Sequence, residues 1–243
     1  MTALTALIAA DLRKVTATRS TWLLVALAGV FCAGFVALEV LVYDVDVVSV
    51  YSMAGQGYLV AMIVGILMVA GEYRHRTMTW AFLVTPRRGR VITAKLVAGG
   101  VVGLAIGVLA AVVTVPLAVI LLSLEGTPLF APEVPLALLG AVGGTALWCV
   151  FGASVGALVR NQAAAVAVAL VWTFYVEWFL VMLVPAVGRW TPSGAARAAS
   201  GWTRADLPVP GELLPMWAGA LVFLGYAVVA AALAQTTTRR DVT

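Results

Sequence analysis

Residues 94–124 read AKLVAGGVVGLAIGVLAAVVTVPLAVILLSL, and this stretch decides the fold class. Between Lys95 and Leu124 it holds no charged residue, so a helix formed here is apolar on every side. Such a helix is buried in a large core or in a membrane. The stretch is longer than the about 20 residues that one span requires. We therefore expect its first turns to lie in the cytosol or among lipid headgroups, and a kink near Pro116.

The rest of the chain has the same apolar character. Of its 243 residues, 63% are apolar and 11% are charged, whereas a soluble domain carries about 25% charged residues. Apolar runs occur at residues 21–42, 53–70, 94–124, 135–158, 163–184 and 213–234. We predict an all-α integral membrane protein with six transmembrane helices, forming one membrane domain over residues 1–243.

This organisation excludes several classes of function. Six spans leave short loops and tails, with no room for a separate ATPase, kinase or DNA-binding domain. The sequence has no G-x-x-x-x-G-K-[ST] motif to hold a nucleotide, and no basic face to hold a nucleic acid. It also has no cluster of His and Cys residues with metal-ligand spacing. We therefore predict neither nucleic-acid binding nor a metal or cofactor in this chain.

One short motif matches the sequence pattern of an enzyme active site. Residues 152–156, Gly-Ala-Ser-Val-Gly, match the G-x-S-x-G pattern of hydrolases, which requires a strand-to-helix turn and a nearby histidine. Here the motif lies inside a predicted span, and the single histidine, His75, lies in a loop. Small residues four positions apart instead favour close helix packing, as does the spacing of Gly99, Gly103 and Gly107. We expect the chain to be no enzyme.

The distribution of Lys and Arg predicts the orientation. If the N-terminus is cytoplasmic, the inner segments hold twelve of the fifteen cations. The outer segments hold Arg189, Arg197 and Arg204. The positive-inside rule then places both termini in the cytoplasm. We predict a multi-pass protein of the plasma (inner) membrane.

Two segments outside the spans have apolar residues of their own. Residues 2–19 have apolar residues at helical spacing and several cations, which predicts a helix along the inner membrane surface, although Asp11 falls on its apolar side. A plain extension of the first span is the alternative. Residues 185–212 mix Pro, Gly and Trp, which predicts short helices dipping into the outer interface.

The inner loop between the second and third spans, residues 71–90, reads GEYRHRTMTWAFLVTPRRGR. It opens with charged residues, continues through a short apolar stretch at 78–84, and breaks at Pro86 before three arginines. The apolar stretch is too short to cross a bilayer. Exposed apolar patches of this kind mark a partner or membrane surface. We therefore predict a short helix that docks on a cytoplasmic partner.

This loop resembles that of the permease subunits of ABC transporters of type-2 topology. The family has a Glu and an Arg at the end of the second span, a short apolar helix, a Pro, an Arg, and a Lys opening the third span. The matching residues are Glu72, Arg74, Thr77, Leu83, Pro86, Arg88 and Lys95. Arg76 departs from the pattern, since the family commonly has Gly there. The resemblance also covers the N-terminal helix, the six spans and the outer segment.

The resemblance implies that residues 72–90 form a coupling helix seated on a separate ATP-binding subunit, present in two copies. In that reading Met78, Phe82 and Leu83 are buried in the complex and exposed in the isolated permease. Arg160 and Asn161, in the next inner turn, are implied as a second cytoplasmic contact. The chain would form the substrate pathway of an exporter as a dimer, with a second copy or a paralogue, and the partner would hold ATP and Mg²⁺. An ATP-independent channel or carrier, or a membrane scaffold subunit, is the alternative.

Two acidic residues lie inside apolar runs. A charge at the centre of a bilayer costs about 2.5–3.5 kcal/mol on insertion scales, so such residues face a cavity or a partner. Glu177 is flanked by Trp172 and Tyr175, and Glu39 lies toward the outer end of the first span. We predict that these four residues line a polar, aromatic substrate path. Interfacial snorkelling or a structural pair is the alternative for either acid.

Overall fold

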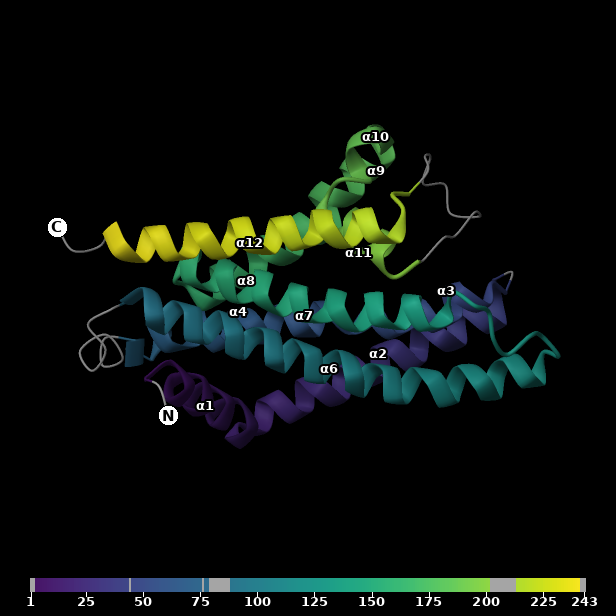
Figure 1. The fold of residues 1–243 in the computed structure, drawn as a ribbon, viewed down its shortest axis with the longest axis horizontal. Coiled ribbons are helices and arrows are strands. Elements are labelled where there is room, and N and C mark those ends of the chain that lie inside the picture. Colours follow the sequence, from purple (N-terminus) through teal and green to yellow (C-terminus); the bar gives the residue numbers. More distant parts are fainter. Residues whose placement is uncertain (1–2, 44, 76, 79–87, 202–212, 241–243) are drawn as a thin grey trace.

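The structure is a computed structural model that describes residues 3–43, 45–75, 77–78, 88–201 and 213–240. Six helical stretches in these residues are long and apolar enough to cross a membrane, which confirms the predicted all-α, multi-pass membrane protein (Figure 1). The elements are α1 (Ala3–Ala17), α2 (Arg19–Val42), α3 (Val47–Ser52), the 3₁₀-helix η1 (Met53–Gly57), α4 (Tyr58–Arg74), α6 (Arg88–Leu124), α7 (Val134–Val159), α8 (Gln162–Val171), the π-helix η2 (Trp172–Val176), α9 (Glu177–Leu183), α10 (Pro185–Gly188), α11 (Pro192–Ala199) and α12 (Met216–Arg240).

The second span begins earlier than the sequence suggests. We predicted it at 53–70, but the candidate span runs over Val47–Arg74, because α3, η1 and α4 follow one another without a break. Its start is set by Asp46, whose side chain accepts a hydrogen bond from the backbone N–H of Ser49 at 3.0 Å and so caps α3. The hydroxyl groups of Ser49 and Ser52 lower the apolarity of this first part, which therefore falls outside the apolar run.

Helices α4 and α7 pack backbone to backbone through glycines. A Cβ atom on Gly65 would overlap the carbonyl oxygen of Cys149, and one on Gly152 would overlap the carbonyl oxygen of Met62. A Cβ on Gly156 would lie 2.8 Å from the Ile66 carbonyl oxygen. The interpretation of the 152–156 motif as helix packing is therefore confirmed.

The hydroxyl group of Ser154, at the centre of this motif, is engaged inside its own helix. It donates to the Val150 carbonyl oxygen at 2.8 Å. The single histidine, His75, lies exposed beyond the end of α4.

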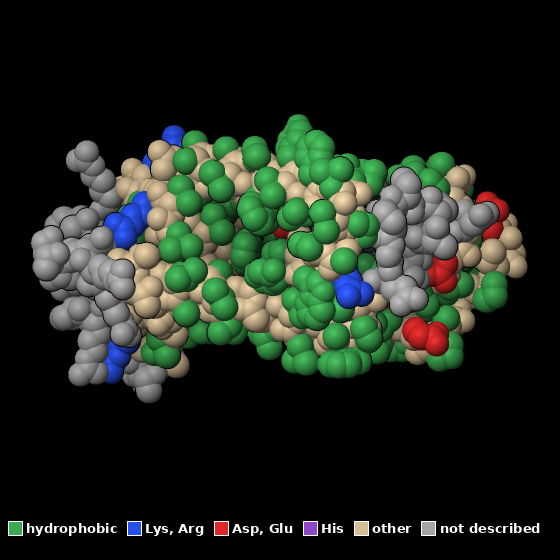
Figure 2. Space-filling model, turned by 90° about the horizontal axis from the view of Figure 1, so that it is seen from above, with side chains coloured by type: hydrophobic (Ala, Val, Ile, Leu, Met, Phe, Trp, Pro, Cys, Tyr) green, Lys and Arg blue, Asp and Glu red, His purple; other side chains and the backbone are tan. Residues whose placement is uncertain are grey.

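The two ends of the bundle differ in charge. The N- and C-termini lie at the same end, where α4 ends and α6 begins (Figure 1). Figure 2 shows Lys and Arg side chains gathered mainly at that end, Asp and Glu side chains at the opposite end, and apolar side chains between them. This is the arrangement of a multi-pass protein that has one basic and one acidic surface.

Candidate functional site

Four charged side chains form a cluster where α1, α4 and α6 meet. Lys95 Nζ lies 3.1 Å from Asp11 Oδ1 and 2.8 Å from Glu72 Oε1. Lys14 Nζ lies 2.9 Å from the same Glu72 oxygen and 3.5 Å from the same Asp11 oxygen. We call these four residues the inner charge cluster. The Lys95 side chain is 3% exposed and that of Lys14 is 61% exposed, so the first cation lies inside the protein and the second at its surface.

The inner charge cluster explains why Asp11 falls on the apolar face of α1. That face packs on α6, and Asp11 meets the buried ammonium group of Lys95 there. Glu72 and Lys95, the acid before the inner loop and the lysine after it, bind each other directly. Partial burial alone would lower the pKa of Lys14, but the carboxylates of Glu72 and Asp11 outweigh this effect and hold that pKa above its usual value.

The inner loop contains one departure from the expected docking surface. Met78 is 2% exposed in the isolated chain, where it packs with Val69, Val91 and Ile92. The expectation that Met78 is exposed until a partner covers it is therefore wrong, because its own chain already covers it. Thr77 and Arg74 are exposed, and the Thr77 hydroxyl group donates to the Glu72 carbonyl oxygen at 3.4 Å. Phe82, Leu83, Pro86 and the side chain of Arg88 lie outside the described residues.

The second inner turn lies beside the first. Arg160 ends α7 in the left-handed conformation, with φ of 57°, and its guanidinium group stands 5.9 Å from the ring centroid of Tyr73. Tyr73 directly follows Glu72, so the two predicted cytoplasmic contacts are neighbours. Asn161 is exposed and caps α8, because its side-chain oxygen accepts from the Ala164 N–H at 3.1 Å. The structure thus gives both residues a role in the turn itself.

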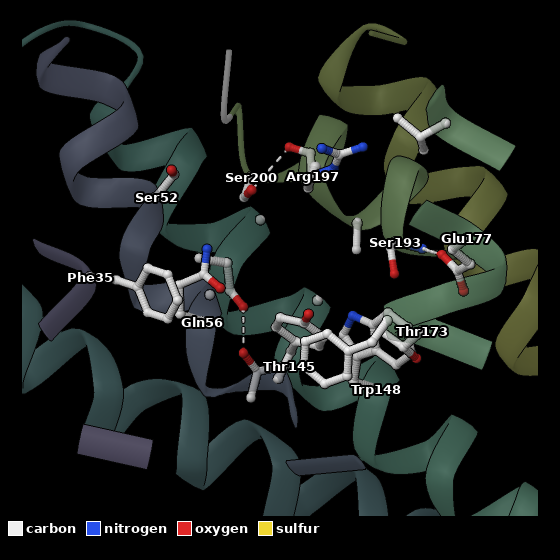
Figure 3. A pocket seen from close by; sticks show the side chains of 18 of the residues that line it. Phe35, Ser52, Gln56, Thr145, Trp148, Thr173, Glu177, Ser193, Arg197 and Ser200 are labelled. Atoms are coloured by element: carbon white, nitrogen blue, oxygen red, sulfur yellow. Dashed lines mark hydrogen bonds between the residues drawn. The ribbon is translucent and has the colours of Figure 1, made fainter. Parts of the chain in front are cut away.

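A cavity of about 330 Å³ lies between the spans. Its walls come from α2, α3, η1, α4 and α7 on one side and from η2, α9 and α11 on the other (Figure 3). Sites for small molecules have volumes of about 300–1,000 Å³ and are mostly apolar, with a few polar groups. The aromatic residues on its walls are Phe35, Tyr58, Trp148, Phe174 and Trp178. Its charged residues are Glu177 and Arg197.

Glu177 follows the π-helix η2 and is 1% exposed. Its Oε2 accepts a hydrogen bond from the backbone N–H of Ser193 at 2.8 Å, which Figure 3 shows as a dashed line between the two residues. Ser193 lies in the first turn of α11, where N–H groups lack partners inside the helix. The other oxygen, Oε1, meets no hydrogen-bond donor among the described residues. Glu177 therefore holds α11 in place.

Arg197 and Ser193 were not predicted as site residues. Both lie on α11, which begins at Pro192 after Thr191, whose hydroxyl oxygen accepts from the Gly194 N–H at 3.2 Å. The spacing of four positions places Ser193 and Arg197 on one side of the helix, and both line the cavity. The proline and the capping threonine signal the helix start, but no pattern in the sequence shows that this helix faces a cavity.

Of the four residues predicted to line a substrate path, the structure brings only Glu177 to the cavity. The side chains of Trp172 and Tyr175 are 44% and 63% exposed and do not line it. Phe174 and Trp178, from the same segment, do line it. Glu39 is buried, but it lies between Val36 and Val40 of a separate apolar cluster and also does not line the cavity. Within the single chain, these four side chains therefore do not line one cavity, and the predicted path remains a prediction.

No protein-family model matches this chain, and no curated protein matches its sequence.

Proposed function

We propose that this chain is the membrane-spanning permease subunit of an ATP-driven ABC exporter of type-2 topology. Two permease chains would form the pathway, and two separate ATP-binding subunits would drive it while holding ATP and Mg²⁺. The observation that carries the proposal is the inner charge cluster. It joins the residue before the inner loop to the lysine after it, and it joins both to α1.

This arrangement suits the transmission of force from a partner. An ion pair between Glu72 and Lys95 fixes the two ends of the inner loop to each other. A push on the loop is therefore passed to α4, α6 and α1 together rather than absorbed by a hinge. Helix α4 then leads to the cavity, because Glu72 lies near its inner end and Tyr58, at its start, lines the cavity.

The cavity serves in this proposal as part of the substrate path. Its apolar walls with one carboxylate and one guanidinium group are typical of a site for a small molecule. An ATP-independent carrier would use the same cavity, so the cavity alone does not choose between the two functions. The partner decides between them, because an ABC permease requires an ATP-binding subunit and a carrier does not.

The test is copurification of the tagged chain with an ATP-binding protein from its own membranes, followed by ATPase measurement. Because Met78 is buried by its own chain, the docking contact falls on Phe82 and Leu83. Each fully buried apolar side chain contributes about 1.5–3 kcal/mol. We expect Phe82→Asp with Leu83→Asp to release or uncouple the ATPase while the spans remain inserted.

A matched control is available at the opposite end of the bundle. Leu129 and Phe130 are 43% and 64% exposed in the loop between α6 and α7. The change of both to Asp adds the same two charges but should leave the ATPase bound and coupled. If the inner pair keeps a coupled ATPase as well as the outer pair does, the coupling role of residues 72–90 is wrong. If no ATP-binding protein copurifies with the unaltered chain, the ABC proposal itself fails.

A further inference from the structure

Three hydroxyl groups of the cavity present acceptors rather than donors. They already donate to backbone carbonyl oxygens: Ser52 Oγ to Ser49 at 2.6 Å, Thr145 Oγ1 to Ala141 at 2.8 Å and Ser200 Oγ to Arg197 at 3.0 Å. A hydroxyl group carries one hydrogen and two lone pairs. What these groups can still offer a ligand is therefore lone pairs, which favour a ligand that is positively charged or donates hydrogen bonds.

The charge of Glu177 points to the same kind of ligand. Within the described residues this carboxylate takes part in no ion pair, and its one close hydrogen bond, at 2.8 Å, comes from a backbone N–H. A carboxylate inside a membrane is stabilised by a cation that enters beside it. The aromatic side chains on the same walls add to this, because ring faces attract organic cations. Trp148 is 2% exposed, and its ring centroid lies 5.2 Å from that of Tyr58.

Arg197 limits the charge of such a ligand. It lines the same cavity, so the formal charges of Glu177 and Arg197 sum to zero there. A ligand with one positive charge gains from Glu177, whereas a second positive charge would meet the guanidinium group.

We propose that the cavity binds a hydrophobic organic cation with a single positive charge, with the Glu177 carboxylate as its counter-charge and aromatic rings as its walls. The inference rests on the proposed function for the idea that this ligand is the transported substrate. Binding itself requires only this chain. It is therefore tested without nucleotide and without an ATPase.

The experiment is isothermal titration calorimetry of the purified chain in detergent with two probes of matched size and opposite charge. Tetraphenylphosphonium is the cation and tetraphenylborate is the anion. We expect saturable binding of the cation near one per chain, weakened at least about tenfold by Glu177→Gln. The amide oxygen of this variant can still accept the Ser193 N–H, so it should fold with α11 in place. Glu39→Gln is the matched control, because Glu39 is equally buried but off the cavity, and should bind within about twofold of the unaltered chain.

Two further variants keep the inference testable if Glu177→Gln unfolds. Glu177→Asp retains the charge and should keep most of the binding, and Trp178→Leu should weaken it about threefold by removing one aromatic wall. Equal binding of the borate probe, or undiminished binding of the cation to Glu177→Gln, overturns the proposal. Cation binding in a chain that has no ATP-binding partner would leave this inference standing while the ABC proposal falls. If the chain copurifies with an ATPase but does not bind the cation, this inference falls while the ABC proposal stands.

Discussion

Replacing Lys95 by Met tests whether the inner charge cluster holds the inner end of the bundle together. The change keeps an unbranched side chain of similar length and removes the charge. It leaves the Asp11 and Glu72 carboxylates without their buried partner, since Lys95 Nζ lies 3.1 Å and 2.8 Å from their oxygens. Lys14 then remains as their one described cation, and it sits at the surface.

The magnitude follows from burial. The Lys95 side chain is 3% exposed and the two carboxylates are 11% and 12% exposed. Removing one partner of a buried pair costs about 3–5 kcal/mol because the other charges stay buried. Lys14 contacts the same two oxygens, but it is 61% exposed, and pairs of that kind contribute about 0–1 kcal/mol. Lys14→Met is therefore the matched control: the same carboxylates, the same substitution, and a loss several-fold smaller.

The assay is denaturant unfolding of the purified chain in detergent, followed by far-ultraviolet circular dichroism. We expect Lys95→Met to lower the free energy of unfolding by about 3–5 kcal/mol and Lys14→Met by at most about 1 kcal/mol. Adding Asp11→Asn to Lys95→Met should restore part of the loss, because one uncompensated charge is removed. Equal losses for the two lysine variants would refute the reasoning, and so would a double variant less stable than Lys95→Met alone.

Two other predictions concern orientation and helix packing. Cysteine placed at Leu129 should react with an impermeant reagent added from outside, whereas cysteine placed at His75 should be protected. The two native cysteines are buried. The opposite labelling pattern would invert the proposed orientation. Gly152→Ala should destabilise the protein by about 1–3 kcal/mol, because its Cβ would overlap the Met62 carbonyl oxygen. Gly143→Ala is the control on the same helix, because no atom lies within 4 Å of the added Cβ. This variant should be as stable as the unaltered protein or more stable by up to about 1 kcal/mol. Thermal unfolding that ranked the two glycine variants the other way would contradict the packing described above.

Much of the fold could be predicted because the membrane imposes a simple rule on sequence. Long apolar runs must become spans, and residues 94–124 require no further information to be recognised as one. Small residues at 152 and 156 likewise predict close packing wherever they fall in a span. The start of the second span could not be found in this way. It depends on a capping contact from Asp46 and on polar residues that are buried only because neighbouring helices surround them.

Of the two charged residues in the cavity, Glu177 could be predicted from the sequence, whereas Arg197 and most of the cavity walls could not. Glu177 could be identified from the sequence because a carboxylate inside a membrane is costly and therefore faces a cavity or a partner. Its neighbours in the sequence gave a misleading indication of the walls, because the side chains of Trp172 and Tyr175, in the π-helix, are exposed. Asp11 gave a usable signal, because an acid on an apolar helix face implies a buried cation opposite it. Met78 gave none, because the same apolar residue suits a partner surface and a contact within its own chain.

The π-helix η2 has a consequence for how this span can change. Buried residues follow at intervals of four along it: Ala165, Ala169, Thr173, Glu177 and Val181. In a regular α-helix of 3.6 residues per turn, each interval of four overshoots by about 40°, so this row would wind about 160° around the span. The wider π turn, with its i→i+5 hydrogen bonds, takes part of that rotation back. Loss of one residue at Tyr175 would remove the wide turn and leave a regular α-helix. Because the wide turn already takes up one extra residue, the residues beyond it would keep nearly the same facing, and Glu177 would still line the cavity. The wide turn thus lets this span carry one residue more than a regular helix without turning the charged side chain of the cavity toward lipid.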